Sequence, residues 1–337
     1  MHNGSSLLEF TQAECTRLGF DDDLAGVIAD ISSACAAISK LVRHGKLAGN
    51  FAAERGTNIQ DEAQKELDFL ANDILIDHAD RGGHLIAVAS EEMEESLAFS
   101  PHKADEKARG NYLLVFDPLD GSSNIEVNGP VGTIFSVLRA PNGARGLDAE
   151  FLQPGTNQLC AGYVLYGTST EMVVTFGKGI AVFTLDSDDD LFKATDHRLI
   201  IDDDTSEYGI NASNQRFWEA PVQRYISEIL AGKDGPRGRD FNMRWAGAMV
   251  ADVHRVLSRG GLFTYPIDEK IRAKGGRLRL MYEANPMSMI MEQAGGLAST
   301  GYGRIMEIMP SDLHQRVPVI LGAKNEVQRL IDYHSAT

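Results

Sequence analysis

The chain contains little of what a disulfide scaffold, a zinc site or a secretory leader requires. Its 337 residues include three cysteines, Cys15, Cys35 and Cys160, which are widely spaced and form no Cys-x-x-Cys pair. This pattern argues against a disulfide framework and a zinc site, and favours reduced thiols in a cytoplasmic protein. The N-terminus, MHNGSSLLEFTQAEC, has neither a basic segment nor a long apolar one, so it does not resemble a secretory signal.

Basic residues and long apolar runs are also scarce. Lys and Arg together number 32 against 48 Asp and Glu, which gives a formal net charge of −16. Sequence-independent binding of nucleic acid depends on cations that neutralise phosphates, so the composition argues against that class of partner. No uncharged apolar stretch reaches the ~18 residues of a membrane-spanning helix, and we expect no membrane segment.

What remains is the composition of a folded protein with a sizeable core, with 43% hydrophobic and 24% charged residues. Apolar residues at helical spacing predict helices over 24–43 and 61–80. Short apolar runs then predict strands at 84–90, 112–116, 131–139, 161–167, 172–176 and 180–185. Beyond residue 205 we expect helices near 217–231, 246–258 and 284–295, and strands near 262–265, 278–282 and 317–321. The alternation predicts a layered mixed α/β fold in two halves, 1–200 and 201–337. The acidic run 186–190 and the polar stretch 201–209 mark the boundary.

The sharpest motif is DPLDGSSN, residues 117–124, directly after the apolar run YLLVF. Pro118 cannot donate to a β-ladder, so we expect the strand to end there and Asp117 and Asp120 to project from one turn. The Ser-Ser-Asn end offers backbone N–H groups that suit an anion. Carboxylates beside such a site would repel a phosphate unless divalent cations such as Mg²⁺, which prefer oxygen ligands, lie between them. An ordinary β-turn rich in Asp, Gly and Ser fits the same eight residues.

Further carboxylates lie near strand ends and on a predicted helix. Glu91 and Glu92 follow the strand 84–90, where they would face the same metal cluster or simply line a solvated loop. On the helix 61–80 the candidates are Glu62, Asp68 and Asp73, although most acids on such a helix are surface charges.

A basic cluster interrupts the acidic chain between residues 270 and 279. Its members are Lys270, Arg272, Lys274, Arg277 and Arg279. Arg277 and Arg279 would share one face of a strand, and guanidinium groups match phosphate oxygens in pairs. Tyr265 precedes the cluster and Glu283 follows it. A charged edge strand or loop is the alternative interpretation.

Taken together, these residues resemble a known family. DPLDGSSN resembles the signature of the Mg²⁺-dependent, lithium-sensitive sugar phosphatases, and the chain from about residue 24 to 335 resembles the class I fructose-1,6-bisphosphatases. The supporting segments include AISKLVR (37–43), QKELD (64–68), SEE (90–92), VGTIFSV (131–137), LQPGTNQLCAGYVLYG (152–167), AMVADVHR (248–255), GGLFTYP (260–266), RLRLMYEANPMSMIMEQAGG (277–296) and HQRVPVILG (314–322).

The resemblance implies an α-β-α-β-α sandwich of the sugar phosphatase type and hydrolysis of the 1-phosphate of D-fructose 1,6-bisphosphate. It also implies two or more Mg²⁺ ions per subunit, with Mn²⁺ as a possible substitute, and a cytoplasmic homotetramer.

The resemblance also assigns roles to individual residues. The metal ligands would be Glu91, Asp117, Asp120, Glu283 and the carbonyl group of Leu119. Asp68 and Glu92 would activate the attacking water, and Glu62 would support it. The 1-phosphate would lie against Asp120, Gly121, Ser122 and Ser123. The sugar and 6-phosphate would lie against Asn211, Tyr265, Arg277 and Arg279, with Arg244 reaching the 6-phosphate site of a neighbouring subunit.

The chain departs from the family pattern on the 6-phosphate side. Arg277 stands where relatives usually have lysine, and Ala212-Ser213-Asn214 replaces the Glu-Gly-Tyr of vertebrate enzymes. Trp245 replaces a tyrosine and lacks its hydroxyl group. Sedoheptulose 1,7-bisphosphate is therefore an alternative or second substrate. A catalytically silent sugar-phosphate sensor is another alternative, although the full set of carboxylates speaks against it.

Regulation is expected to differ as well. In AMP-inhibited relatives, Thr and Gly near position 21 meet the nucleotide phosphate and a Lys-Tyr pair assists. Here the corresponding residues are Asp21-Asp22-Asp23, Ala25 and Asn111-Tyr112. Carboxylates suit a helix N-terminus but repel a phosphate, so we expect no inhibition by micromolar AMP. The thioredoxin-regulated chloroplast members carry a cysteine-rich insertion. In the comparable region this chain has only Cys160, so we expect no activation by dithiols.

Overall fold

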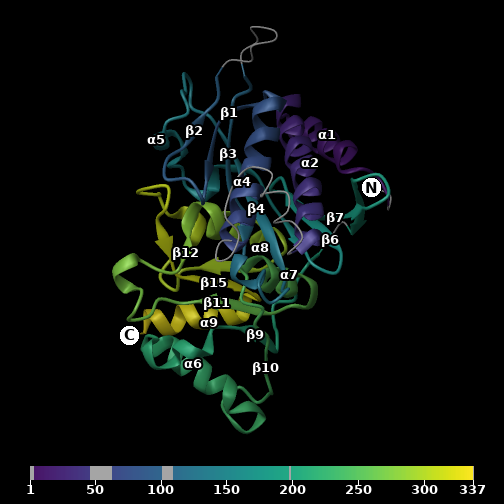
Figure 1. Ribbon diagram of the computed structural model, residues 1–337. Helices are drawn as coiled ribbons and strands as arrows, with labels where there is room; N and C mark the ends of the chain where they lie inside the picture. The colour runs from purple at the N-terminus through teal and green to yellow at the C-terminus, as the bar shows by residue number, and fades with distance from the viewer. Residues whose placement is uncertain (1–3, 46–62, 101–108, 197–198, 337) are drawn as a thin grey trace.

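In the computed structural model, residues 4–45, 63–100, 109–196 and 199–336 are described, and they form five alternating layers of helices and sheets (Figure 1). The first layer holds α1 (Leu7–Leu18), α2 (Asp22–His44) and α4 (Ala63–Gly82). The third holds α7 (Met249–Arg259) and α8 (Asn285–Gln293), and the fifth holds α6 (Ala220–Leu230) and α9 (Lys324–Ser335). The expected α-β-α-β-α sandwich is confirmed.

The second layer is an eight-stranded mixed sheet. Its strands, in spatial order, are β2 (Leu97–Ala98), β1 (Leu85–Ser90), β3 (Tyr112–Asp120), β4 (Val131–Arg139), β5 (Gln158–Tyr166), β6 (Thr170–Thr175), β7 (Ile180–Asp186) and β8 (Leu191–Asp196). Only the pairing of β1 with β3 is parallel among the described pairs of this sheet. The carboxyl ends of β1 and β3 therefore meet at one edge, where the acidic motifs lie.

The fourth layer is a five-stranded mixed sheet. Its spatial order is β10 (Asn242–Met243), β9 (Glu207–Gly209), β11 (Leu262–Tyr265), β15 (Val319–Gly322) and β13 (Leu297–Ser299). A separate antiparallel pair joins β12 (Leu278–Arg279) to β14 (Arg316–Val317). This small pair carries two of the basic residues to the cleft described below.

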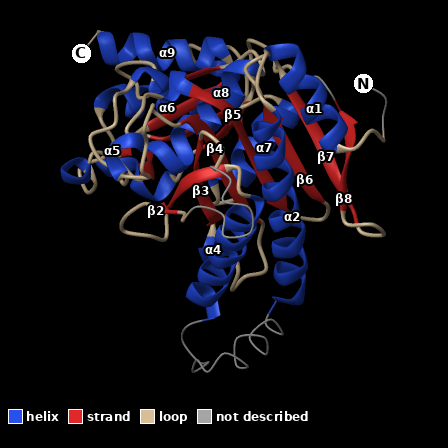
Figure 2. Cartoon of the chain, turned by 90° about the horizontal axis from the view of Figure 1, so that it is seen from above, coloured by secondary structure: helices blue, strands red, loops and turns tan. Residues whose placement is uncertain are grey.

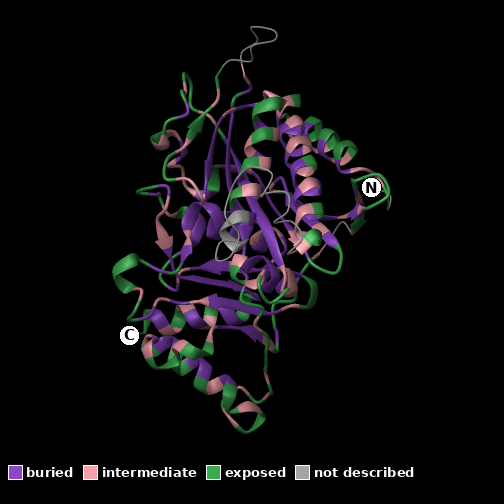
Figure 3. Cartoon of the chain, viewed as in Figure 1, coloured by how far each residue is buried: buried purple, intermediate pink, exposed green. Residues whose placement is uncertain are grey.

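Buried residues, purple in Figure 3, concentrate on the strands of both sheets and on the helices packed against them. The middle core joins Ile134 and Tyr163 of the large sheet to Phe263 and Leu321 of the small one, with α7 and α8 between them. Both halves of the chain thus contribute to one continuous apolar cluster. The division at about residue 200 stays a prediction.

Helix α2 has a length and composition that would also suit a membrane span. Half of its most apolar window is buried inside the protein. It packs beside α1 and α4, and Figure 2 shows α2 and α4 running side by side. Leu24, Ile28 and Ile31 lie at helical spacing on its buried face. These contacts identify α2 as a core helix. A core helix can have the same length and apolar composition as a membrane span.

Strand β3 does not end before Pro118, as the sequence predicted, but continues to Asp120. Its register against β4 shifts between Asp117, which lies opposite Ile134, and Asp120, which lies opposite Gly132. Three steps on β3 thus match two on β4, and Pro118 falls within this bulge, where its missing N–H is tolerated. In a regular strand, residues three apart point to opposite faces, so the bulge allows both aspartates to face the same side.

The predicted strand over 278–282 is also wrong beyond its first two residues. After β12 the chain enters a π-helical turn, η7 (Leu280–Ala284), which leads directly into α8. Leu280, Met281 and Tyr282 are buried, and a short buried apolar run does not distinguish a strand from a helix. The turn places Glu283 on a helix that faces β3, and such π-turns occur frequently at functional sites.

Candidate active site

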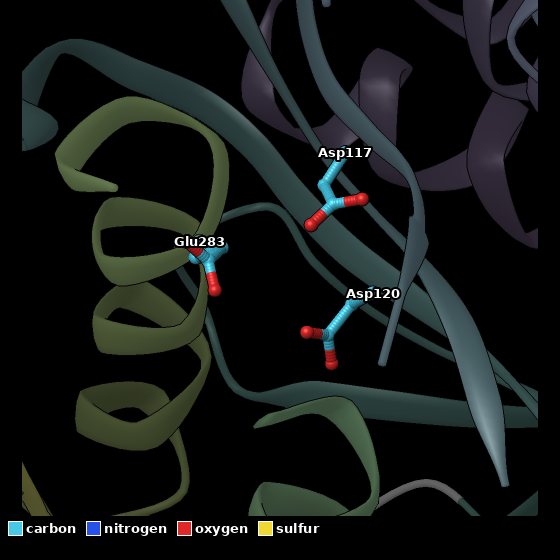
Figure 4. Close-up of side chains that lie close together, drawn as sticks. All are labelled: Asp117, Asp120 and Glu283. Atoms are coloured by element: carbon cyan, nitrogen blue, oxygen red, sulfur yellow. The ribbon is translucent and has the colours of Figure 1, made fainter. Parts of the chain in front are cut away.

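Three buried carboxylates converge at the end of β3. Asp117 and Asp120 come from the bulge and Glu283 comes from η7, and each offers an oxygen within 4.8 Å of the others. Figure 4 shows the three side chains around the space between β3 and the helix that carries Glu283. Each residue is only 7–8% exposed. Three carboxylates that lie this close together and are buried from water require bound protons or cations to balance their charge.

The electrostatics of the cluster fit a divalent metal ion. Burial raises the pKa of Asp120 to about 7 and that of Glu283 to about 8, and the neighbouring carboxylates add to both shifts. Burial and the charges of Asp120, Glu91 and Glu283 hold the pKa of Asp117 well above its usual range. The donors are all oxygen atoms, which are the ligands that Mg²⁺ prefers. The residues present therefore fit the Mg²⁺ on which the family depends.

Glu91 and Glu92 continue from β1 into the same cleft. Glu91 N–H donates to Phe116 O at 3.0 Å, which extends the pairing with β3 and places Glu91 beside the cluster. The Glu91 carboxylate accepts a hydrogen bond from Arg279 Nε. Burial and the charge of Glu91 raise the pKa of Glu92 to about 7. Glu91 is thus paired with a guanidinium group, whereas Glu92 lies beside the carboxylates of Glu91 and Asp68.

Asp68 reaches the same group of acids from α4. It is 8% exposed, and burial followed by the charge of Glu92 raises its pKa to about 7, which a hydrogen bond with Ser122 opposes. Asp68 thus lies between Glu92 and the DPLDGSSN turn, whereas Asp73 on the same helix is exposed. Glu62 lies outside the described residues.

Residues at the start of α7 contact the DPLDGSSN turn and hold it in place. Gly121 has φ 80°, and a Cβ added to it would lie 2.3 Å from the Cβ of Ala248, so glycine is required on both grounds. Ser122–Asn124 then form a short 3₁₀ turn, η2. Asp120 Oδ2 accepts the N–H of Val250 at 2.6 Å. Leu119 is buried within the bulge, and its N–H donates to Asp117 Oδ1 at 3.0 Å.

One cleft of about 740 Å³ joins the acidic cluster to the basic side. Its lining contains the expected metal ligands, namely Glu91, Asp117, Leu119, Asp120 and Glu283, and the expected phosphate residues Gly121, Ser122 and Ser123. It also contains Glu92 and the expected sugar-binding residues Asn211, Tyr265, Arg277 and Arg279. Arg244 is exposed and is not in this lining, and its Nη1 donates to Met243 O at 2.9 Å. The structure therefore brings together residues from positions 91 to 283 and leaves Arg244 facing outwards.

Several cleft residues were not predicted from the sequence. Arg316 lies opposite Arg279 across the β12–β14 pair, and its Nη1 donates to Arg277 O at 2.5 Å. Burial, followed by the charges of Arg279 and Arg277, lowers the pKa of Arg316. Phe263 and Met249 add apolar surface. The sequence could have indicated a role for Arg316 because it lies in HQRVPVILG, one of the segments that resemble the family. No local pattern indicated that this segment pairs with residues 278–279.

Sequence and structure comparisons agree with this geometry. Residues 8–197 match the fructose-1-6-bisphosphatase N-terminal domain family, and residues 201–335 match the corresponding C-terminal domain family. A class 1 fructose-1,6-bisphosphatase from Methylobacillus flagellatus is 52% identical over 331 residues, which cover 98% of each chain.

Two solved structures of the Leishmania major fructose-1,6-bisphosphatase share the fold. The holo form has a TM-score of 0.84 and 32% identity, covering 98% of this chain and 99% of the other. The T-state structure has a TM-score of 0.87 and 31% identity and covers both chains completely. The full-length similarity to proteins with this one activity, together with the acidic cleft at the expected positions, shows that the chain belongs to the class 1 fructose-1,6-bisphosphatase family.

Proposed function

We propose that this cleft hydrolyses the 1-phosphate of D-fructose 1,6-bisphosphate with two or more Mg²⁺ ions held by its carboxylates. The observation that carries the proposal is the triad Asp117, Asp120 and Glu283, whose buried oxygens approach within 4.8 Å of one another. Glu91 and the carbonyl group of Leu119 would complete the ligand set. When bound, the ions would neutralise phosphate oxygens and make a water molecule more acidic.

The residues around the triad suit the remaining parts of the reaction. Asp68 and Glu92, which both have pKa values raised to about 7, would accept the proton of the attacking water. The Gly121–Ser123 segment would cradle the 1-phosphate beside Asp120. A phosphate monoester dianion repels an anionic nucleophile, so the reaction gains most from groups that fix the orientation and balance the charge.

The basic side of the cleft would hold the rest of the substrate. Arg279 and Arg316 lie on the β12–β14 pair and Arg277 directly precedes β12, and all three line the cleft together with Asn211 and Tyr265. Binding energy from the distant 6-phosphate would hold the 1-phosphate in line for attack. Arg316 is our addition to the residues that the family resemblance assigned.

The longer sugar sedoheptulose 1,7-bisphosphate is the second candidate substrate. The observation that favours it is the wall near Trp245, where the indole ring stacks on Phe263 with centroids 5.9 Å apart. An aromatic surface replaces the hydroxyl group that tyrosine would supply there, and such a surface contacts apolar faces of a sugar without a fixed hydrogen bond.

A homotetramer in the cytoplasm is the assembly we propose. Arg244 is exposed directly after the edge strand β10, where a second copy of the chain would meet its side chain. The three cysteines are all buried, as suits a reducing compartment. Sedimentation analysis of the purified protein would test the assembly directly.

The activity is tested by phosphate release from both bisphosphates in the presence and absence of Mg²⁺. We expect release from fructose 1,6-bisphosphate that depends on Mg²⁺ and is lost in Asp117→Asn. Glu292→Gln, a carboxylate paired with Arg304 outside the cleft, is the matched control and should retain activity. Binding of either sugar without turnover in the presence of Mg²⁺ would instead support a silent sensor.

A further inference from the structure

Asp252 does not itself line the cleft, but its carboxylate holds a loop, residues 245–247, that does. Asp252 belongs to the start of α7 and is 4% exposed. Its Oδ1 accepts the N–H of Ala246 at 2.8 Å, and its Oδ2 accepts the N–H of Gly247 at 3.1 Å. Both oxygens of one buried acid are thus used to fix two successive backbone amides of the segment that precedes α7.

The same segment, 246–250, rests on the DPLDGSSN turn at three alternate positions. Asn124 Nδ2 donates to Ala246 O at 3.1 Å. Ala248 packs against Gly121 so closely that the glycine admits no Cβ. Val250 N–H donates to Asp120 Oδ2 at 2.6 Å. The segment is therefore fixed to the acidic side of the cleft at its carbonyl, side-chain and amide groups.

Trp245 sits immediately before this fixed segment. The preceding residue, Arg244, is attached to β9 because its N–H donates to Tyr208 O at 2.8 Å. The Trp245 ring lies parallel to that of Phe263, with an interplanar angle of 1°, and its centroid is 6.0 Å from that of Tyr265. All three rings line the cleft. The position of this aromatic wall relative to the acidic cluster thus depends on how the chain runs from residue 244 to 247.

The two hydrogen bonds from the amides of Ala246 and Gly247 require a carboxylate as their acceptor. Hydrogen bonds to an ionised acceptor are stronger than neutral ones, and both oxygens of a carboxylate accept. An asparagine of the same shape would turn an NH₂ group towards one of the two amides, which sets donor against donor. Ala246 and Gly247 are exposed, so an amide that loses its acceptor can turn to water, and the loop would move away from α7.

We propose that Asp252 is a positioning residue for substrate binding, which sets the distance between the Trp245 wall and the acidic cluster by holding the amides of Ala246 and Gly247. The assignment rests on the proposed function of the cleft. It gives Asp252 no contact with the substrate and no part in the chemical step. It makes Trp245 the cleft residue through which Asp252 acts on substrate binding.

The test compares Asp252→Asn with the parent protein, both in a Trp218→Phe background. The chain has two tryptophans, so Trp245 then provides the only indole emission. We expect Asp252→Asn to raise KM for fructose 1,6-bisphosphate on the order of 10-fold while kcat changes by less than ~3-fold. The emission of Trp245 should shift to longer wavelength in the absence of substrate, because the released loop exposes the ring. Mg²⁺ binding, titrated without substrate, should be unchanged.

The matched control is Glu150→Gln. Glu150 also accepts successive loop amides, from Arg145, Gly146 and Leu147, but none of these residues lines the cleft. It should leave KM and the Trp245 emission unchanged. If Asp252→Asn does not fold, Asp252→Ser removes the charge without setting a donor against an amide, and the same shifts are expected from it.

A folded Asp252 variant with unchanged KM and unchanged Trp245 emission would overturn the proposal. A parallel loss of kcat and Mg²⁺ binding would also overturn it, because Asp252 would then act on Asp120 through Val250. Absence of phosphate release from the parent protein would contradict the proposed function alone, since the emission of Trp245 tests the loop without turnover.

Discussion

Arg279 Nε donates a hydrogen bond to Glu91 Oε1 and joins two residues that lie 188 positions apart in the chain. The same arginine donates its backbone N–H to Glu283 at 2.6 Å, and its Nη1 contacts His314 Nδ1 at 2.8 Å. The guanidinium group thus supplies a positive charge beside the expected metal ligands, and contacts to Glu91 and His314 hold it there while Glu283 holds the backbone of the same residue. Its charge balances that of Glu91.

Replacing Arg279 by glutamine should strengthen the binding of divalent cations. Removing one positive charge near the site lowers the repulsion of Mg²⁺, and we expect an affinity gain of roughly 3–10-fold. Calorimetric titration of the substrate-free protein with Mg²⁺ measures this directly. Arg304→Gln, which breaks an arginine–glutamate pair outside the cleft, should leave the affinity unchanged. Weaker Mg²⁺ binding by Arg279→Gln would show that the arginine organises Glu91 rather than competes for it.

Asp68→Asn and Glu92→Gln should each lower kcat by at least ~10²-fold with little change in the fold. Both acids are half-buried or buried beside the DPLDGSSN turn, and their pKa values are raised to about 7, which suits transfer of a proton near neutral pH. Steady-state phosphate release is the measurement. Asp73→Asn, an exposed acid on the same helix, is the control. Near-normal turnover in both variants would remove the pair from the mechanism.

Arg277→Ala should raise KM for the bisphosphate by more than ~10-fold, because hydrogen bonds to charged groups are worth roughly 1.5–3 kcal/mol. Arg277 is exposed, yet it lines the cleft beside Arg279 and Arg316. Arg272→Ala provides the comparison, since Arg272 pairs with Glu219 instead. An unchanged KM for Arg277→Ala would place this residue outside the phosphate site.

The metal-free protein should lose stability as pH rises through the neutral range. The pKa values of Asp68, Glu92 and Asp120 are raised to about 7 and that of Glu283 to about 8, whereas these groups titrate near 4 when unfolded. The folded state therefore binds more protons between these values, and the free energy of unfolding falls as pH increases from about 4 to about 8.

Mg²⁺ should reverse this loss by replacing the protons. At about 100 times its Kd a ligand stabilises by roughly 2.7 kcal/mol, which raises Tm on the order of 5 °C. Thermal melts at pH 6 and pH 8.5, with and without Mg²⁺, should show the larger metal-induced shift at the higher pH. Na⁺ at equal ionic strength is the control. Equal shifts at both pH values would mean that the raised pKa groups do not hold the metal.

AMP should not inhibit at micromolar concentration. Asp21 precedes α2, and its carboxylate accepts the Tyr112 hydroxyl at 2.5 Å and lies 3.8 Å from Arg139 Nη1. The Arg139 guanidinium in turn covers the Tyr112 ring at 4.9 Å. The residues that correspond to a nucleotide site in relatives are thus bonded to one another and carry an acid. A titration that gives half-inhibition at micromolar AMP, without competition against substrate or Mg²⁺, would contradict this expectation.

Much of the local structure was predictable because its cause lies within a few residues. The apolar spacing of α2 depends on side chains three or four positions apart, and β4 and β5 were indicated by short apolar runs, which the structure buries on both faces. Helix α1 was missed even though Ser6 and Glu9 form a capping box, which is a signal in the sequence. The acids of DPLDGSSN and Glu91 were recognised as candidates because each follows an apolar run of strand length.

By itself, the sequence determined the family, the order of most of the elements and the set of acids and bases available for chemistry. Only the tertiary structure decided how they meet. The bulge at Pro118 turns Asp117 and Asp120 to one side, the π-helical turn presents Glu283 to them, and Arg279 reaches Glu91. These relationships depend on strand register and on packing between layers, which bring residues that are far apart in the chain into one buried cluster. No local pattern specifies which residues meet there, because charges buried away from water must be balanced by partners from other parts of the chain.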